Sequence, residues 1–170
     1  MPPMRRSVMA SSLVAFLLGA LAAVAGAAET PAGKGVILLV RHAERPPLEA
    51  PGDDPSLTDA GKARAERLAT AVARYGVRAI YVTRFRRTQE TAKPAADRLG
   101  LTPIVESETT GLVTTLTTRG AETALVVGHS DTLPDVIQAF GGPAVAIDDD
   151  DFDDLFVLVP ATGGLTRLSY

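Results

Sequence analysis

The stretch that decides the fold is "VILLVRHAER", residues 36–45. Its first five residues are branched and apolar without polar alternation, which is typical of a strand buried on both faces of a sheet. The run ends abruptly in Arg41 and His42, and Glu44 and Arg45 follow directly. Titratable side chains at the end of a buried strand indicate either a solvated loop or the floor of a binding site. The pattern of the remaining strands decides between these two interpretations.

From residue 35 onward, apolar runs alternate with helical patterns. Strands are predicted from their apolar and β-branched residues at 35–40, 77–83, 101–107, 123–128, 154–159 and 165–170. Helices are predicted at 56–76, 86–100 and 132–142. We expect Ser56 or Thr58 to cap the first helix, and Pro94 to kink or break the second.

Strands that alternate with helices form βαβ units, which build a parallel sheet with helices on both faces. The two closing strands are joined by a short turn and would add an antiparallel edge. The sequence therefore predicts an α/β fold, a three-layer α/β/α sandwich with a mostly parallel central sheet and an antiparallel edge strand.

Residues 1–28 are predicted to be a signal peptide, with residues 35–170 forming one domain. Two arginines precede a long apolar run without charges, and small residues suited to cleavage follow it. The alternative is an uncleaved membrane anchor, because the run approaches the roughly 20 residues that span a bilayer. We expect a bacterial protein that is exported to the periplasm or secreted, and that meets a membrane only if this segment is retained.

Composition excludes several classes of function. The chain has 170 residues, a formal net charge of -3 and no cysteine, so disulfides and thiolate metal sites are impossible. Mild acidity argues against a nucleic-acid partner. The acidic run over residues 148–154 lacks the pattern of a calcium loop and is predicted to be a solvated loop. We expect no metal and no cofactor, and the sequence leaves the oligomeric state open.

Both histidines of the chain, His42 and His129, directly follow predicted buried strands. The carboxyl ends of parallel strands form the ligand-binding edge of such a sheet. Several arginines reach the same edge, and arginine forks with helix N-terminal N–H groups form an anion site suited to phosphate. A single histidine after a strand more often has a structural role. Because both histidines of the chain follow predicted strands, they indicate a functional site.

Two histidines beside a phosphate indicate covalent catalysis. A neutral imidazole can attack phosphorus and form a phosphohistidine that water then hydrolyses. Nearby arginine charges keep the imidazole neutral and stabilise the equatorial oxygens. A general acid would protonate the leaving oxygen.

Four segments resemble the histidine phosphatase superfamily, of phosphoglycerate-mutase-like fold, in its small single-domain branch. In chain order these are "LVRHAER", "SLTDAGKARAERLA", "YVTRFRRTQETAKPAA" and "LVVGHSDTLPDVI". The resemblance implies that His42 is the nucleophile and His129 the second pocket histidine. It further implies that Arg41 and Arg87 bind phosphate together with both histidines, and that Ser130 lends a backbone N–H.

The chain also departs from the family pattern. The usual glycine after the nucleophile is Ala43, and Arg84 adds a positive charge after the second strand. Asp131 and Glu44 are the candidates for the general acid, or there is none. The acidic residues of "VESE", residues 105–108, are available but do not match a family motif.

The leading hypothesis is an exported phosphatase that hydrolyses phosphomonoesters or phosphoproteins in the cell envelope through phospho-His42. Its expected partner is a phosphorylated small molecule, glycan or protein, and not a nucleic acid. The alternatives are a non-catalytic phosphate-binding module of the same fold and a phosphoglycerate-mutase-type phosphotransferase.

Overall fold

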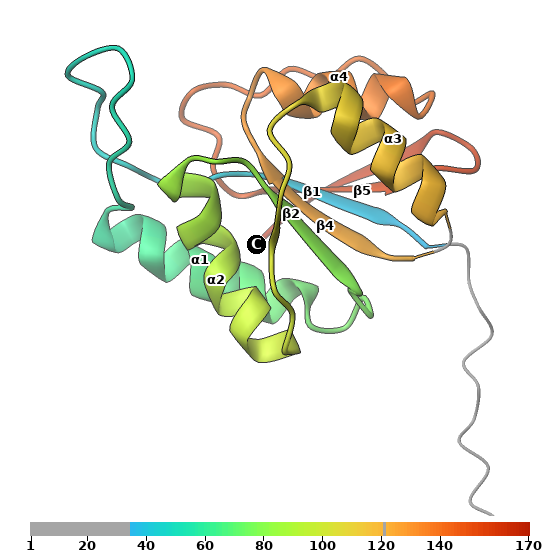
Figure 1. The fold of residues 1–170 in the computed structure, drawn as a ribbon, viewed down its shortest axis with the longest axis horizontal. Coiled ribbons are helices and arrows are strands. Elements are labelled where there is room, and N and C mark those ends of the chain that lie inside the picture. The colour runs from blue at the N-terminus through green and yellow to red at the C-terminus, as the bar shows by residue number, and fades with distance from the viewer. Residues whose placement is uncertain (1–34, 121) are drawn as a thin grey trace, which may run out of the picture.

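A computed structural model describes residues 35–120 and 122–170, and the predicted signal peptide, residues 1–28, lies outside them. The described part contains a six-stranded sheet of order β3-β2-β4-β1-β5-β6 (Figure 1). Neighbours among β1 to β4 pair in parallel, whereas β5 and β6 pair antiparallel. The strands are β1 (Ile37–Arg41), β2 (Ala79–Val82), β3 (Ile104–Val105), β4 (Ala124–Gly128), β5 (Asp154–Val159) and β6 (Gly164–Ser169).

Helices cover both faces of the sheet (Figure 1). Alternate residues of β1 point to opposite faces, and Leu38 and Val40 belong to the core under α1 (Asp59–Val72) and α2 (Arg86–Leu99). On the other face, Leu39 packs in the core under α3 (Thr109–Arg119) and α4 (Thr132–Ala139). The three-layer α/β/α sandwich is therefore confirmed. Within the described residues, no helix is long and apolar enough to cross a membrane.

The start of α1 fixes the chain that leaves β1. Thr58 caps the helix as predicted, because its Oγ1 accepts a hydrogen bond from the N–H of Gly61 at 3.1 Å. Gly61 packs against the backbone of Glu44 so closely that a Cβ there would overlap the Glu44 carbonyl oxygen. The N–H of Thr58 donates to the same carbonyl at 2.9 Å. These contacts hold the segment that follows His42 against α1.

Two helices differ from the sequence-based expectation. The helix α2 is continuous from Arg86 to Leu99, so the predicted break at Pro94 is wrong. The helix α3 was not predicted, because its sequence "TTGLVTTLTTR" is rich in threonine and buries only Leu112 and Leu116. Threonine has weak helix propensity, so tertiary packing of those two leucines stabilises this helix.

The register of the sheet sets the position of the candidate site. Arg41 at the end of β1 is paired with Gly128 at the end of β4, and Val82 at the end of β2 is paired with Val127. The three strands are neighbours in the sheet, so the residues that follow them meet at one edge.

Candidate active site

The strand ends bring His42, Thr83 and His129 together. The backbone N–H of His42 donates to the carbonyl of Gly128 at 3.0 Å, which ties the chain after β1 to the end of β4. The two imidazole centroids are 5.4 Å apart with an interplanar angle of 64°. Thr83 Oγ1 lies 3.1 Å from Nε2 of His129. Histidines 87 positions apart in the sequence thus form a pair at the carboxyl edge of the parallel strands.

His42 is held as a neutral ring with one nitrogen free. Its side chain is 4% exposed, and its Nδ1 lies 2.8 Å from the carbonyl oxygen of Ala43. A carbonyl only accepts hydrogen bonds, so the neutral ring carries its proton on Nδ1 and its lone pair on Nε2. Burial, with smaller contributions from His129 and Arg87, lowers the pKa of His42 to about 3. At neutral pH the Nε2 atom is therefore an unprotonated nucleophile.

His129 is also neutral at neutral pH. Burial and then the charge of Arg87 lower the pKa of its imidazole to about 4, and the Asp131 carboxylate offsets part of this effect. The ring meets Phe85 edge to face, with centroids 5.5 Å apart and an interplanar angle of 82°. Thr83 and Phe85 therefore orient His129 beside His42.

Three guanidinium groups carry buried N–H groups without a hydrogen-bond partner in the described protein: Arg41 at Nε, Arg45 at Nε, and Arg87 at Nε and Nη1. Arg45 and Arg41 both act electrostatically on Arg87 and His129, so the charges gather around the histidine pair. Buried donors are normally satisfied, because leaving one unpaired costs about 1–3 kcal/mol. Such a convergence of donors fits an oxyanion with several acceptor oxygens, such as a phosphoryl group.

Arg87 is the guanidinium that lies deepest on the α2 side. Its side chain is 11% exposed and stacks over the Phe85 ring at 4.1 Å. The Asp54 carboxylate is 3.9 Å from its Nη1, and the same carboxylate accepts the N–H of Arg86 at the start of α2. Asp54 therefore occupies the N-terminus of α2, so the anion site rests on arginine side chains there and not on helix N–H groups.

Arg41 corrects the interpretation of the acidic run. Residues 148–153 form a loop that folds over its guanidinium, with Nη1 donating to the carbonyl of Asp148 at 2.8 Å. The carboxylate of Asp149 lies 3.6 Å from Nη2, and the ring of Phe152 lies 4.4 Å from the guanidinium carbon. The run is therefore not merely a solvated loop. It binds Nη1 and Nη2 of Arg41 and leaves the Nε atom without a partner.

Ala43 replaces the family glycine without backbone strain. Its N–H donates to Thr91 Oγ1 at 2.9 Å, and the residue is fully buried. In the described part of the chain only glycines have positive φ, so Ala43 has an ordinary backbone conformation that tolerates a Cβ.

Of the two acid candidates, Glu44 is turned away from the histidine pair. Arg64 binds both of its carboxylate oxygens, with N–O distances of 2.7 to 2.9 Å. Burial, the largest single effect, raises the pKa of Glu44, but the hydrogen bonds from Arg64, a backbone hydrogen bond and the charges of Arg64 and Arg67 together bring that pKa below its usual value. A carboxylate held ionised in this way is a poor proton donor, so the structure does not support Glu44 as the acid.

Asp131 lies on the same side as His129. It directly precedes α4, its side chain makes no capping hydrogen bond, and it is exposed. Its charge acts on both His129 and Arg87, which places it near the mouth of the pocket. Ser130 is half-buried in the turn between His129 and Asp131, where its backbone leads into α4.

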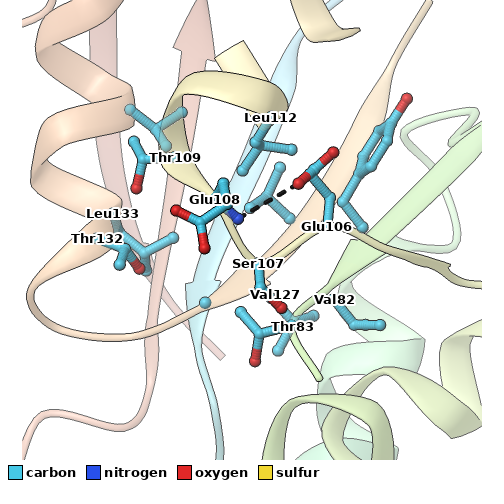
Figure 2. A pocket seen from close by; sticks show the side chains of 14 residues that line it. Val82, Thr83, Glu106, Ser107, Glu108, Thr109, Leu112, Val127, Thr132 and Leu133 are labelled. Carbon is cyan, nitrogen blue, oxygen red and sulfur yellow. Dashed lines mark hydrogen bonds between the residues drawn. The ribbon is translucent and has the colours of Figure 1, made fainter. Parts of the chain in front are cut away.

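Glu106 and Glu108 lie on the connection between β3 and α3, and line the same pocket as Thr83 (Figure 2). Their side chains line a cavity of about 20 Å³ together with Thr83 and Thr132. The Glu106 carboxylate accepts a hydrogen bond from the N–H of Glu108 at 3.3 Å. This cavity has room for about one water molecule and not for a substrate.

The sequence matches the model of the histidine phosphatase superfamily (branch 1) over residues 37–112. The matched segment contains Arg41, His42 and Arg87 and ends before His129. No protein of curated function shows significant similarity to the whole sequence.

Solved structures share the fold at low identity. The protein histidine phosphatase SixA, solved with tungstate, is 19% identical with a TM-score of 0.62, covering 79% of this chain and 96% of its own. The SixA protein of Agrobacterium tumefaciens is 21% identical with a TM-score of 0.62, covering 81% and 100%. A mycobacterial glucosyl-3-phosphoglycerate phosphatase is 11% identical with a TM-score of 0.61, covering 80% and 98%.

The structural likeness establishes the fold. Over residues 37–112 the sequence is similar to the histidine phosphatase superfamily (branch 1).

Proposed function

We propose that the protein is a phosphatase that hydrolyses phosphomonoesters, including those on proteins, through a phosphohistidine on His42. The observation that carries the proposal is the free Nε2 of a buried neutral imidazole beside guanidinium N–H groups that lack partners. Solved relatives hold oxyanions of the same kind: SixA was solved with tungstate, and the mycobacterial phosphatase with inorganic phosphate.

In the first step, the Nε2 lone pair of His42 forms a bond to phosphorus as the bond from phosphorus to the ester oxygen breaks. The leaving oxygen takes the bonding electrons and is protonated by an acid. In the second step, water attacks phosphorus and gives a proton to the base left by the acid, the electrons of the N–P bond return to Nε2, and inorganic phosphate leaves. Arg41, Arg45 and Arg87 would stabilise charge on the equatorial oxygens in both steps, and His129 would donate to or position the same oxygens.

We assign the acid to Asp131, because Glu44 is locked in its pair with Arg64. Asp131 has no such partner among the described residues. It stands two residues after His129, and its charge acts on both His129 and Arg87.

Leaving-group dependence tests this assignment. In Asp131→Asn we expect kcat for alkyl phosphates to fall about 10²-fold, because their leaving oxygen needs a proton. For p-nitrophenyl phosphate, whose leaving group needs none, we expect a fall of less than about threefold. Glu44→Gln is the matched control and should affect both substrates equally. Equal effects of Asp131→Asn on both substrates would remove Asp131 from the acid role.

We further propose that the enzyme acts outside the cytoplasm, in the cell envelope, on a phosphorylated small molecule, glycan or protein. The support is the N-terminal sequence: a basic start, a charge-free apolar run and small residues before position 29. Mass spectrometry of the protein recovered from cell fractions would test this. A chain beginning near residue 29 in the periplasm or medium is expected, and a full-length chain in the cytoplasm would contradict the proposal.

A further inference from the structure

A second cavity lies beside Phe85, whose ring contacts His129. It has a volume of about 480 Å³ and lies between the start of α2 and the connection from β1 to α1. Figure 1 shows this connection as the loop that extends away from the sheet at the upper left, beside the start of α2. Small-molecule sites typically have volumes of about 300–1,000 Å³, so this cavity can take an organic group.

The cavity and the phosphoryl site share two walls. Arg87, which offers N–H groups to the phosphoryl pocket, also lines the cavity. Phe85 lines the cavity too, and its ring contacts His129 edge to face. A group attached to a phosphoryl bound at His42 would therefore extend across Phe85 into the cavity.

The outer wall of the cavity is apolar at one point and cationic at another. Leu48, on the loop, is 44% exposed although it is a large hydrophobic residue. Arg84 is exposed, stacks 5.0 Å from the centroid of the Phe85 ring, and forms no ion pair within the described residues. A planar guanidinium and an aromatic ring next to an aliphatic side chain suit an aromatic ligand, which gains from both apolar burial and cation–π contact.

Asp53 and Asp54 of the loop already have partners, in the loop itself and at the start of α2. Asp53 Oδ2 accepts the N–H groups of Glu49 and Ala50 at 2.9 and 2.7 Å. Asp54 accepts the N–H of Arg86 and faces Arg87. These carboxylates hold the loop in place, so they give the cavity its shape and do not themselves need a cationic ligand.

We propose that this cavity binds the leaving group of the substrate, and that the preferred substrates are phosphate esters of aromatic alcohols. The inference rests on the proposed phosphatase function and names the substrate class of that site. The aryl ring lies against Phe85 and Leu48 while its phosphoryl group meets His42 and the arginines. The chemistry is unchanged: the bond from phosphorus to the aryl oxygen breaks as the bond to Nε2 of His42 forms.

The test compares phenyl phosphate with 2-naphthyl phosphate, whose alcohols are of closely similar acidity but differ by one fused ring. In the native protein we expect kcat/KM to be about 5- to 20-fold higher for the naphthyl ester, through the apolar area its second ring buries. In Leu48→Ser most of this preference should disappear, because kcat/KM should fall more for the larger naphthyl ester than for phenyl phosphate. Leu48→Met, which keeps an apolar side chain, should retain it.

The possible outcomes distinguish a failure of the cavity assignment from a failure of the phosphatase proposal. Equal kcat/KM for the two esters in the native protein, with turnover that needs His42, would overturn the cavity assignment alone. A naphthyl preference that survives in both Leu48→Ser and Arg84→Gln would also overturn it. Hydrolysis of neither ester would overturn the phosphatase proposal, and the cavity assignment with it. Because Leu48 is exposed, the variants should fold, and an unchanged thermal unfolding midpoint verifies this.

Discussion

Replacing His42 with alanine should abolish phosphatase turnover, with kcat for p-nitrophenyl phosphate falling at least about 10³-fold. The imidazole supplies the atom that bonds to phosphorus in the proposed mechanism, and its neutral form with a free Nε2 is the form that can do so. The remaining arginines would still bind the ester, so KM should change far less than kcat. Phosphate release and the KM-against-kcat split measure the two effects.

Two further measurements separate loss of the nucleophile from loss of the fold. The native enzyme, quenched in alkali after mixing with labelled substrate, should carry acid-labile phosphate on His42. The variant His42→Asn keeps an amide N–H near the position of Nδ1 and can still donate to Ala43, but it has no nucleophilic ring nitrogen. It should unfold at nearly the native temperature and be as inactive as His42→Ala. Turnover that persists in either variant would contradict the assignment.

The fold was predictable because its signals are local and strong. The apolar runs 36–40 and 124–127 can only be buried on both faces, and the helices between the strands fix a parallel sheet. Once the sheet is parallel, topology brings the ends of β1 and β4 to one edge. The meeting of His42 and His129 therefore follows from the pattern alone, before any side chain is placed.

The direction of side chains after the strands was not predictable. Glu44 and Arg45 are adjacent in the sequence, yet Glu44 pairs with Arg64 on α1, and Arg45 leaves a buried unpaired Nε. The close approach of Gly61 to the Glu44 backbone and the hydrogen bonds from Arg64 to the Glu44 carboxylate are tertiary contacts that no local pattern reveals. Arg45 is therefore absent from the site residues expected from the sequence, although its charge close to the Arg41-His42 motif could have indicated a phosphate ligand.

The role of the acidic run and the presence of α3 could not be predicted for a related reason. Residues 148–153 have the composition of a solvated loop, and their function lies in backbone carbonyls that hold Arg41, which composition cannot reveal. Tyr170 at the end of the chain donates its hydroxyl hydrogen to the carbonyl of Phe152 at 3.2 Å, so a residue far along the sequence helps position that loop. Threonine-rich α3 forms because the sheet offers a face for its two buried leucines.

Replacing Arg87 with glutamine should lower kcat/KM about 10²- to 10³-fold, the usual effect of removing one donor that stabilises transition-state charge. Two N–H groups of Arg87 are buried without partners, so the free protein holds this charge at a cost in stability. Its replacement should therefore leave the thermal unfolding midpoint unchanged or higher while activity falls. Arg86→Gln is the matched control, since Arg86 directly precedes Arg87 in α2, is exposed, and pairs with Glu90.

The pH profile gives this prediction a second readout. The Arg87 charge contributes to lowering the pKa of both His42 and His129, after burial as the main cause. Protonation of His42 removes the nucleophile, so activity is lost as pH falls through its pKa. Without Arg87 that pKa rises, and the acid limb of kcat/KM for p-nitrophenyl phosphate should move to higher pH than in the native enzyme. Ionisation of the substrate cancels in this comparison because both enzymes receive the same ester. An acid limb that stays in place in Arg87→Gln, together with a loss of activity below about threefold, would show that Arg87 stands outside the phosphoryl pocket.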